Sequence, residues 1–401
     1  GGDGSAPDSA TASSVESPPD PFASLAGFCD GIVPPGADEY AEHVARIQRH
    51  LTAEGYDGLV TEPSATMTWL SGVRWGRSER PFLMLTPAKG EPTFVCPAFE
   101  EGTARERLGG AKLRVWNEDE DPFAPLAAAL PRRSGKVAVD GETRAFIVQG
   151  LRGACKQAIV DGRDVVDAGR MVKTELELSR LRRANEATKA ALSLVAGVLK
   201  EGMPQSEVAS LVIAAQERAG LTGVWPLVLV GKNAAFPHGT QEDRVVTAGD
   251  LLLVDTGGTL HGYRSDITRT WAVGTPAADA AKAWRTVAAA QRAGLDVMRP
   301  GVTCGEVDAA ARAVIEDAGY GKGYTALTHR LGHGIGLQVH EPPYLRPRND
   351  RVLAAGMTMS NEPGIYRRGE YGVRIEDIVA ITGDGVEVFG PTVKSLEQPF
   401  G

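Results

Sequence analysis

Four carboxylates in the C-terminal half of the chain occupy positions where the neighbouring residues predict apolar β-strands. Asp255 ends the run Leu251–Val254, and Asp266 lies in the returning strand of the same predicted hairpin. Glu362 directly follows another predicted strand, and Glu376 is enclosed by isoleucines. Aspartate is rare in strands, and burying a carboxylate without a partner costs several kcal/mol. A cation that binds these groups together would remove that cost, so the set indicates a metal site.

A histidine in a glycine-rich segment completes this candidate ligand set. His333 lies in the run Gly332–Gly336, where alternate glycines permit close approach of the backbone. Four carboxylates and one imidazole suit two divalent cations, because four negative charges balance four positive ones. Oxygen-rich sets with one histidine favour manganese, zinc, cobalt or iron(II). Two adjacent cations can hold a hydroxide and polarise a carbonyl group, which predicts a hydrolase.

Two further histidines, His238 and His340, are candidates for proton transfer or substrate binding. Beside a metal pair, an imidazole can donate a hydrogen bond to the scissile carbonyl or carry a proton. Other hydrolytic sites are disfavoured. His329 and His333 have the spacing of a zinc helix, but Arg330 replaces the glutamate of H-E-x-x-H, and no G-x-S-x-G motif occurs.

Charge and hydropathy exclude several classes of partner. The 401 residues carry 43 basic and 51 acidic side chains, a net charge of −8, without a long Lys/Arg run. This balance disfavours nucleic acid and anionic membranes as partners. No segment approaches the ~18 uninterrupted apolar residues of a transmembrane helix. The cysteines form no C-x-x-C pair, which disfavours a cysteine-based zinc site.

The composition changes twice along the chain, which predicts a leader and two domains. Residues 1–36 are rich in Gly, Ser, Ala, Pro and Asp, and we expect a disordered leader there. Residues 37–165 predict an α/β domain, and residues 166–401 predict an α+β domain. The expected location is the cytoplasm. Export followed by removal of a signal peptide is the alternative, because neither an initiator methionine nor an apolar signal core is present.

The second predicted domain supplies the elements that must position the ligands. Residues 250–273 predict a β-hairpin with Gly257–Gly258 near its turn. Helices are expected at residues 174–200, 206–220, 277–298 and 304–318, and strands near residues 357–361, 374–381 and 386–389.

The ordered ligand set resembles that of the pita-bread metallopeptidases, which include methionine aminopeptidase, aminopeptidase P, Xaa-Pro dipeptidase (prolidase) and the metal-free relative creatinase. The motifs that carry this resemblance are Val254-Asp255-Thr256-Gly257-Gly258, Ser265-Asp266-Ile267-Thr268-Arg269-Thr270, the run from His329 to Glu341, Asn361-Glu362-Pro363-Gly364-Ile365-Tyr366 and Val373-Arg374-Ile375-Glu376-Asp377. The resemblance covers residues 37–401. It implies an α+β fold, with a C-terminal pita-bread domain preceded by a smaller α/β domain of the creatinase type.

The resemblance also implies which residues bind metal. Asp255 would bind one ion, Asp266 and Glu376 would bridge both, and His333 and Glu362 would complete the second site. The cofactors implied are two divalent metal ions per chain, with manganese, zinc and cobalt as the candidates.

The remaining site residues are assigned by the same resemblance. It implies catalytic roles for His238, His340, Glu362 and Arg374, and substrate binding by His238, His340, Tyr366 and Arg374. Arg374 lies two residues before Glu376 and therefore shares its side of a strand. There it would orient a bridging carboxylate, hold a substrate carboxylate or form a structural ion pair. The chain departs from many relatives with Xaa-Pro activity in having Gly239, and no tyrosine, after His238.

Within this group the chain is most similar to bacterial prolidases. Its amino domain disfavours a methionine aminopeptidase, and its complete ligand set disfavours creatinase. The implied function is hydrolysis of the bond before proline in Xaa-Pro dipeptides by a hydroxide held between two metals. The alternatives are an aminopeptidase P that cleaves longer Xaa-Pro peptides, an organophosphate hydrolase and a non-catalytic pita-bread binding module. The resemblance further implies a homodimer, with the loop Val73–Arg80 as a candidate contact.

Overall fold

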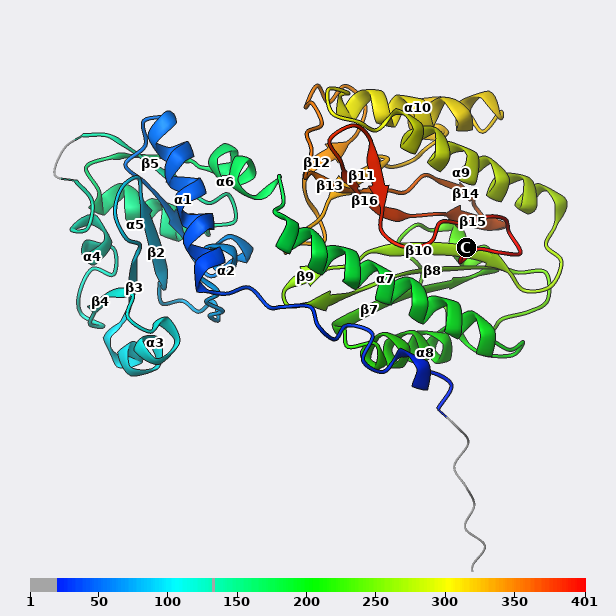
Figure 1. The fold of residues 1–401 in the computed structure, drawn as a ribbon, viewed down its shortest axis with the longest axis horizontal. Coiled ribbons are helices and arrows are strands. Elements are labelled where there is room, and N and C mark those ends of the chain that lie inside the picture. The colour runs from blue at the N-terminus through cyan, green and yellow to red at the C-terminus, as the bar shows by residue number, and fades with distance from the viewer. Residues whose placement is uncertain (1–19, 132–133) are drawn as a thin grey trace, which may run out of the picture.

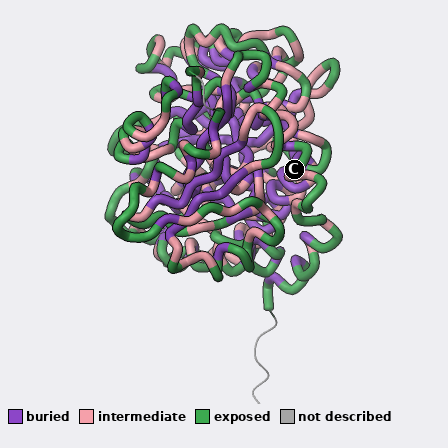
Figure 2. Tube along the Cα trace, turned by 90° about the vertical axis from the view of Figure 1, so that its left-hand side faces the viewer, coloured by how far each residue is buried: buried purple, intermediate pink, exposed green. Residues whose placement is uncertain are grey.

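The computed structural model describes residues 20–131 and 134–401, which form two domains (Figure 1). An amino-terminal domain precedes helix α7 (Glu175–Val198), and a larger carboxyl-terminal domain begins with it. Buried segments run through the interior, and exposed segments surround them (Figure 2). In the part of the chain that the structure describes, no helix combines the length and apolar character that crossing a bilayer requires.

The amino-terminal domain is built on one six-stranded sheet with the order β4-β3-β2-β1-β5-β6. Its strands are β1 (Gly58–Thr61), β2 (Leu83–Pro87), β3 (Thr93–Pro97), β4 (Lys112–Trp116), β5 (Lys136–Val139) and β6 (Ala158–Asp161). Its helices are α1 (Ala37–Ala53), α2 (Ala65–Ser71), α3 (Glu101–Leu108), α4 (Ala124–Ala127), α5 (Ala145–Ala154) and α6 (Arg163–Arg170). Leu59 and Val60 are adjacent in β1 but belong to different apolar clusters, so the central strand is covered on both faces.

Helix α6 crosses the division that the sequence predicts at residues 165 and 166. Val165 and Val166 belong to the apolar cluster of the amino-terminal domain, and α6 packs against α1. Thr174 then caps α7, because its side chain accepts a hydrogen bond from the Glu177 amide and Glu177 returns one to the Thr174 amide. In the structure, therefore, the amino-terminal domain continues through α6.

The carboxyl-terminal domain contains two larger sheets and one two-stranded sheet, with helices on the outer faces (Figure 1). One sheet has the order β10-β8-β7, with β9 paired to β8; the other has the order β12-β11-β13-β16-β17, and β14 and β15 pair separately. The strands are β7 (Thr222–Val230), β8 (Leu251–Leu260), β9 (Tyr263–Arg264), β10 (Ile267–Ala272), β11 (Gly332–Gly334), β12 (Glu341–Leu345), β13 (Thr358–Asn361), β14 (Gly364–Arg367), β15 (Tyr371–Arg374), β16 (Asp377–Ile381) and β17 (Val386–Val388).

Two helices cover each larger sheet of this domain. Helices α7 and α8 (Gln205–Arg218) pack on the sheet that contains β8, whereas α9 (Ala278–Val297) and α10 (Cys304–Asp317) pack on the elements around β12 and β15. The antiparallel pairing of these strands confirms the predicted α+β class.

The turn of the predicted hairpin lies elsewhere than the sequence suggests. Gly257 and Gly258 lie inside β8, and the chain reverses at His261 and Gly262, which both have positive φ. A Cβ atom on Gly257 would collide with the carbonyl of Ser265, so this glycine permits close strand contact. The predicted hairpin is present, but Gly257 and Gly258, which were expected near its turn, lie inside the strand that precedes it.

Part of the predicted leader is ordered against the carboxyl-terminal domain. The prediction for residues 1–19 lies outside the described residues, but Phe22, Leu25 and Cys29 are buried in the apolar cluster that α7 and α8 form. The Cys29 amide donates to the carbonyl of Ala219 at 3.2 Å. Residues 20–36 differ from the expectation because these few apolar side chains enter an existing groove and need no core of their own.

Truncation of this segment tests whether it contributes to stability. Leu25→Ala removes a side chain that is 3% exposed, so we expect the free energy of unfolding to fall by about 2–4 kcal/mol in a urea titration. Val33→Ala, at a position that is 66% exposed, is the control and should change it by less than about 0.5 kcal/mol. Equal stability of the two variants would show that the segment is not packed in solution.

Candidate metal centre

Strand register brings two of the candidate ligands together at the meeting point of the two sheets. Asp255 in β8 is paired with Thr268 in β10, and Thr268 forms an antiparallel bridge with Glu376, which precedes β16. The hydroxyl of Thr268 donates to Glu376 Oε2 at 2.7 Å. Hydrogen bonding across these strands therefore places Asp255 and Glu376 side by side, although 121 residues separate them in the sequence (376 − 255).

The carboxylates and His333 form two overlapping groups that could each hold an ion. One group contains Asp255, Asp266 and Glu376, and the other contains His333, Glu362 and Glu376; in each, the potential ligand atoms lie within 4.8 Å of one another. Glu376 belongs to both groups, which is the arrangement that two adjacent cations need.

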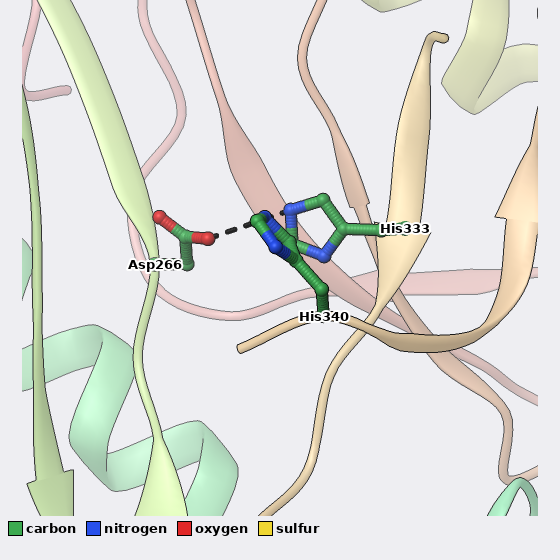
Figure 3. A group of neighbouring side chains, drawn as sticks. All are labelled: Asp266, His333 and His340. Atoms are coloured by element: carbon green, nitrogen blue, oxygen red, sulfur yellow. Dashed lines mark ion pairs between the residues drawn. The ribbon is translucent and has the colours of Figure 1, made fainter. Parts of the chain in front are cut away.

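The ring of His333 is oriented so that one nitrogen faces the carboxylates. Its Nδ1 lies 3.0 Å from the carbonyl of Gly334, so Nδ1 carries the proton and donates it to that oxygen. Its Nε2 lies 3.2 Å from Glu362 Oε1 and 3.5 Å from Asp266 Oδ2. Figure 3 shows Asp266, His333 and His340 converging, with the ion pair between Asp266 and His333 dashed. The ring of His340 stands edge-on to that of His333, with centroids 4.1 Å apart.

Crowding of buried carboxylates gives this site an excess of negative charge. Burial, followed by the charges of Glu376 and Asp255, raises the pKa of Asp266 well above its usual value. Burial, followed by Glu362 and Asp255, does the same to the pKa of Glu376. For Glu362 burial also acts to raise the pKa, but the hydrogen bond and charge of His333 outweigh it and lower the pKa to about 2.

Two carboxylate oxygens in this group have no hydrogen-bond donor. Asp255 Oδ1 and Glu376 Oε1 are buried and unpartnered within the described residues. Buried polar atoms are nearly always satisfied in proteins, and both residues belong to the carboxylate group that could hold an ion. The residues present therefore fit a pair of divalent cations, because cations supply the missing partner and neutralise the excess charge.

Arg374 forms hydrogen bonds with a candidate metal ligand and with two neighbouring side chains. Its guanidinium is buried and donates to Asp255 Oδ2 at 2.7 Å, to Tyr366 Oη at 2.9 Å and to Thr268 Oγ1 at 3.2 Å. The Tyr366 hydroxyl in turn lies 2.8 Å from Nε2 of His329. Arg374 thus forms a buried ion pair with Asp255, which the resemblance assigns to one ion, and not with a carboxylate expected to bridge both ions.

Two residues with support roles were missed by sequence reasoning. His329 was noted only for its spacing from His333, but it holds Tyr366. Asp377 lies behind Glu376 and pairs with Arg269 at 2.7 Å and Lys189 at 2.6 Å, all three fully buried or nearly so. Its adjacency to a candidate ligand was the one available signal, whereas its two partners are distant in sequence.

A cavity of about 910 Å³ opens above the ligands. Its wall is apolar around Trp225, Leu227 and Val339, and His238 and His340 also line it. Tyr366 is absent from the described lining, and its hydroxyl accepts a hydrogen bond from Arg374 at 2.9 Å. Burial, followed by the charges of His333 and Arg330, lowers the pKa of His340 to about 4. His340 is therefore a neutral imidazole at pH ~7 and can donate an N–H from one nitrogen.

The loop expected to contact a second subunit lies apart from this cavity. Arg74 lines a different cavity of about 640 Å³ between the domains, together with Arg264. Trp75 stacks on Phe82 with ring centroids 4.3 Å apart. The structure thus places part of the Val73–Arg80 loop against the chain's own amino-terminal domain.

Comparison with known proteins identifies both domains. Residues 179–383 match metallopeptidase family M24, and residues 43–172 match the creatinase/prolidase N-terminal domain. The chain is 37% identical over 354 residues to the probable dipeptidase PepE of Mycobacterium tuberculosis, covering 87% of this chain and 94% of that protein. It is 34% identical over 365 residues to the Xaa-Pro dipeptidase of Lactobacillus delbrueckii subsp. lactis, covering 88% and 97%.

A solved structure supports the same relationship. The crystal structure of dipeptidase PepE from Mycobacterium ulcerans superimposes with a TM-score of 0.85 at 36% identity, covering 90% of this chain and 97% of that one. The agreement extends across both domains and confirms the predicted pita-bread domain with its creatinase-type amino-terminal domain.

Carboxylate crowding predicts how pH affects the metal-free protein. The folded state retains protons on Asp266 and Glu376 that the unfolded chain releases above about pH 4. Stability without metal therefore falls as the pH rises from that value towards the folded-state pKa. We expect the gap in melting temperature between Mn²⁺-loaded and metal-free protein to widen from about pH 5 to about pH 8.

Glu376→Gln should raise the melting temperature of the metal-free protein at about pH 8 and shrink the increase caused by Mn²⁺, because one crowded charge is gone. Glu370→Gln, at an exposed position, is the matched control and should change neither. A gap that stays constant with pH would contradict the assignment of these carboxylates as metal ligands.

Proposed function

This chain belongs to metallopeptidase family M24, and from that premise we propose that it is an Xaa-Pro dipeptidase that works with two divalent metal ions. The observation that carries the proposal is the sharing of Glu376 between two groups of potential ligands on the floor of the histidine-lined cavity. The activity named for the Lactobacillus relative supports the choice of Xaa-Pro dipeptides as substrates.

We assign the ligands as the resemblance implies: Asp255 to one ion, His333 and Glu362 to the other, and Asp266 and Glu376 to both. Manganese, zinc and cobalt are the candidate metals. Bound there, two such ions would provide a nucleophilic hydroxide near neutral pH and would polarise the scissile carbonyl. Buried Arg374 keeps Asp255 in place through the 2.7 Å ion pair.

We assign proton transfer and substrate binding to one carboxylate and two histidines of the chain. Glu362 is held on its Oε1 side by Ser360 at 2.9 Å and by His333, so we assign its Oε2 as the proton acceptor for the attacking water. His340 is neutral and can donate its N–H to the substrate carbonyl. His238, on the exposed rim of the cavity, is assigned to substrate binding and proton transfer on the other side.

Arg330 is the cation in the cavity that is free to bind a substrate carboxylate. Arg374 is neutralised by Asp255, whereas Arg330 makes no ion pair within the described residues. Its guanidinium lies on the face of Tyr344, 4.3 Å from the ring centroid, which holds the side chain without satisfying its charge. We propose that Arg330 pairs with the C-terminal carboxylate of the dipeptide and so limits substrate length.

The homodimer and the cytoplasmic location remain predictions, with export as the alternative for the latter. The aminopeptidase P, organophosphate hydrolase and binding-module alternatives make different predictions in the assay below.

The substrate assay compares Ala-Pro, Ala-Pro-Ala and Ala-Ala with the Mn²⁺-loaded enzyme. We expect Ala-Pro to be cleaved fastest, because the pyrrolidine ring fits the apolar wall and its carboxylate reaches Arg330. Faster cleavage of Ala-Pro-Ala would assign an aminopeptidase P. Equal cleavage of Ala-Ala would remove the preference for proline, and no cleavage of any peptide would favour a non-catalytic module or an organophosphate hydrolase.

Substitution of Arg330 tests carboxylate recognition. Arg330→Met should lower kcat/KM for Ala-Pro by about 10- to 100-fold, because the substrate carboxylate loses its partner in the cavity. Ala-Pro amide, which lacks that charge, should be affected by less than about 2-fold. Arg367→Met is the matched control, since Arg367 also lies over a tyrosine ring, that of Tyr320, but is exposed and outside the cavity lining. An equal loss on both substrates would reject the assignment.

A further inference from the structure

The loop that carries His340 is held by the amino-terminal domain. Residues 335–340 connect β11 to β12. Two residues of this loop, Leu337 and Gln338, contact that domain, and so does Glu341 at the start of β12. Leu337 packs against the apolar cluster of the amino-terminal domain as well as against one in the carboxyl-terminal domain. The Gln338 amide Nε2 donates to Glu142 Oε1 at 2.6 Å. The third contact is made by Glu341, directly after His340.

Glu341 is the centre of a buried charge network between the domains. Its Oε2 lies 2.7 Å from Nη2 of Arg170, in α6, and its Oε1 lies 2.8 Å from Nζ of Lys173. Arg170 also donates to the hydroxyl of Thr66, in α2, at 3.2 Å. Glu341 is only 4% exposed, and Arg170 and Lys173 are similarly buried. Buried ion pairs of this kind need accurate geometry, because both charges have lost their water.

The loop itself folds around this carboxylate. The backbone amide of Gln338 donates to Glu341 Oε2 at 3.3 Å. A Cβ atom at Gly336 would lie 2.5 Å from Glu341 Oε1, so glycine is required there to leave room for the charged group. The amide of Gly336 donates to the carbonyl of Gln338 at 3.0 Å, which closes the turn. The conformation of the loop at Gly336 and at Gln338 therefore depends on where the Glu341 carboxylate lies.

We infer that Arg170, Glu341 and Lys173 are positioning residues that set His340 against the ligand His333 and the substrate cavity. His340 precedes Glu341 by one peptide bond, and its ring centroid lies 4.1 Å from that of His333. In this arrangement the amino-terminal domain helps to build the active site of its own chain. The inference rests on the proposed function, since His340 matters only if the cavity binds a peptide.

Arg170 is the residue to substitute. The network holds two cations against one carboxylate, so Arg170→Met leaves the balanced pair of Glu341 and Lys173 in place. The variant frees the loop from α6 while Glu341 keeps Lys173 as its partner. Arg170→Lys restores the charge at a shorter reach and serves as the conservative variant.

The experiment measures kcat, KM, metal content and hydrogen exchange for Arg170→Met with Ala-Pro as substrate. We expect kcat to fall about 10-fold or more, because a shift of about 1 Å in a reacting group has effects of this size. KM and the bound Mn²⁺ should change by less than about 2-fold. Amide exchange should accelerate in residues 335–341, and Arg170→Lys should recover part of kcat.

Two comparisons separate positioning from general loss of stability. Arg180→Met is the matched control, because Arg180 in α7 is equally buried and pairs with Glu39 in α1 across the same domain boundary, at 2.6 Å. It should lower the melting temperature but leave kcat within about 2-fold and exchange in 335–341 unchanged. In a His340→Ala background, Arg170→Met should reduce kcat by less than about 2-fold further, because both changes remove the same contribution.

Three results would overturn the inference. They are wild-type kcat in Arg170→Met, a full further loss in the His340→Ala background, and equal effects of Arg170→Met and Arg180→Met on kcat. If Arg170→Met does not fold, Arg170→Lys in both backgrounds gives the same test of non-additivity. If the wild-type enzyme cleaves no Xaa-Pro peptide, the proposed function fails, and hydrogen exchange still reports whether Arg170 holds the loop.

Discussion

The mutual repulsion of four carboxylates in one buried site is the constraint on which the rest of the structure depends. Asp255, Asp266, Glu362 and Glu376 face one another with one imidazole among them. Water cannot screen them there, so their charges must be neutralised by cations or by protons. A fold that tolerates this arrangement without metal has to hold each carboxylate by other means.

The surrounding hydrogen bonds show how three of the candidate ligands are held. Asp255 is fixed by Arg374, Glu376 by Thr268, and Glu362 by Ser360. Behind Glu376, the Arg269 guanidinium donates to its carbonyl at 2.7 Å and pairs with Asp377. Because these partners lie on neighbouring strands, the sheets themselves set the spacing of the ligands. Such outer contacts orient ligands and raise the precision of a metal site.

The two domains are connected by buried charges as well as by apolar packing. Glu341 meets Arg170 and Lys173 on one side of the junction, and Arg180 meets Glu39 on another. Charged pairs fix one relative position more sharply than apolar contacts do, since their strength depends on close approach and direction. Residues of the amino-terminal domain therefore contact the loop that carries His340, although the site itself lies in the carboxyl-terminal domain.

Residue types and their local order determined most of the secondary structure and the choice of candidate ligands. The spacing of apolar residues predicted most strands and helices, and carboxylates in apolar strands pointed to a candidate ligand set whose geometry the structure describes. These inferences succeed because burying a charge is costly wherever it occurs, so a charged residue in an apolar run is informative by itself. Only the tertiary structure decided the rest. The hairpin turn lies at His261 and Gly262, and residues from 20–36 pack in an apolar core. Arg374 pairs with Asp255, and Glu341 pairs with Arg170. Each of these depends on contacts between segments far apart in the chain, and sequence order does not specify which distant groups meet.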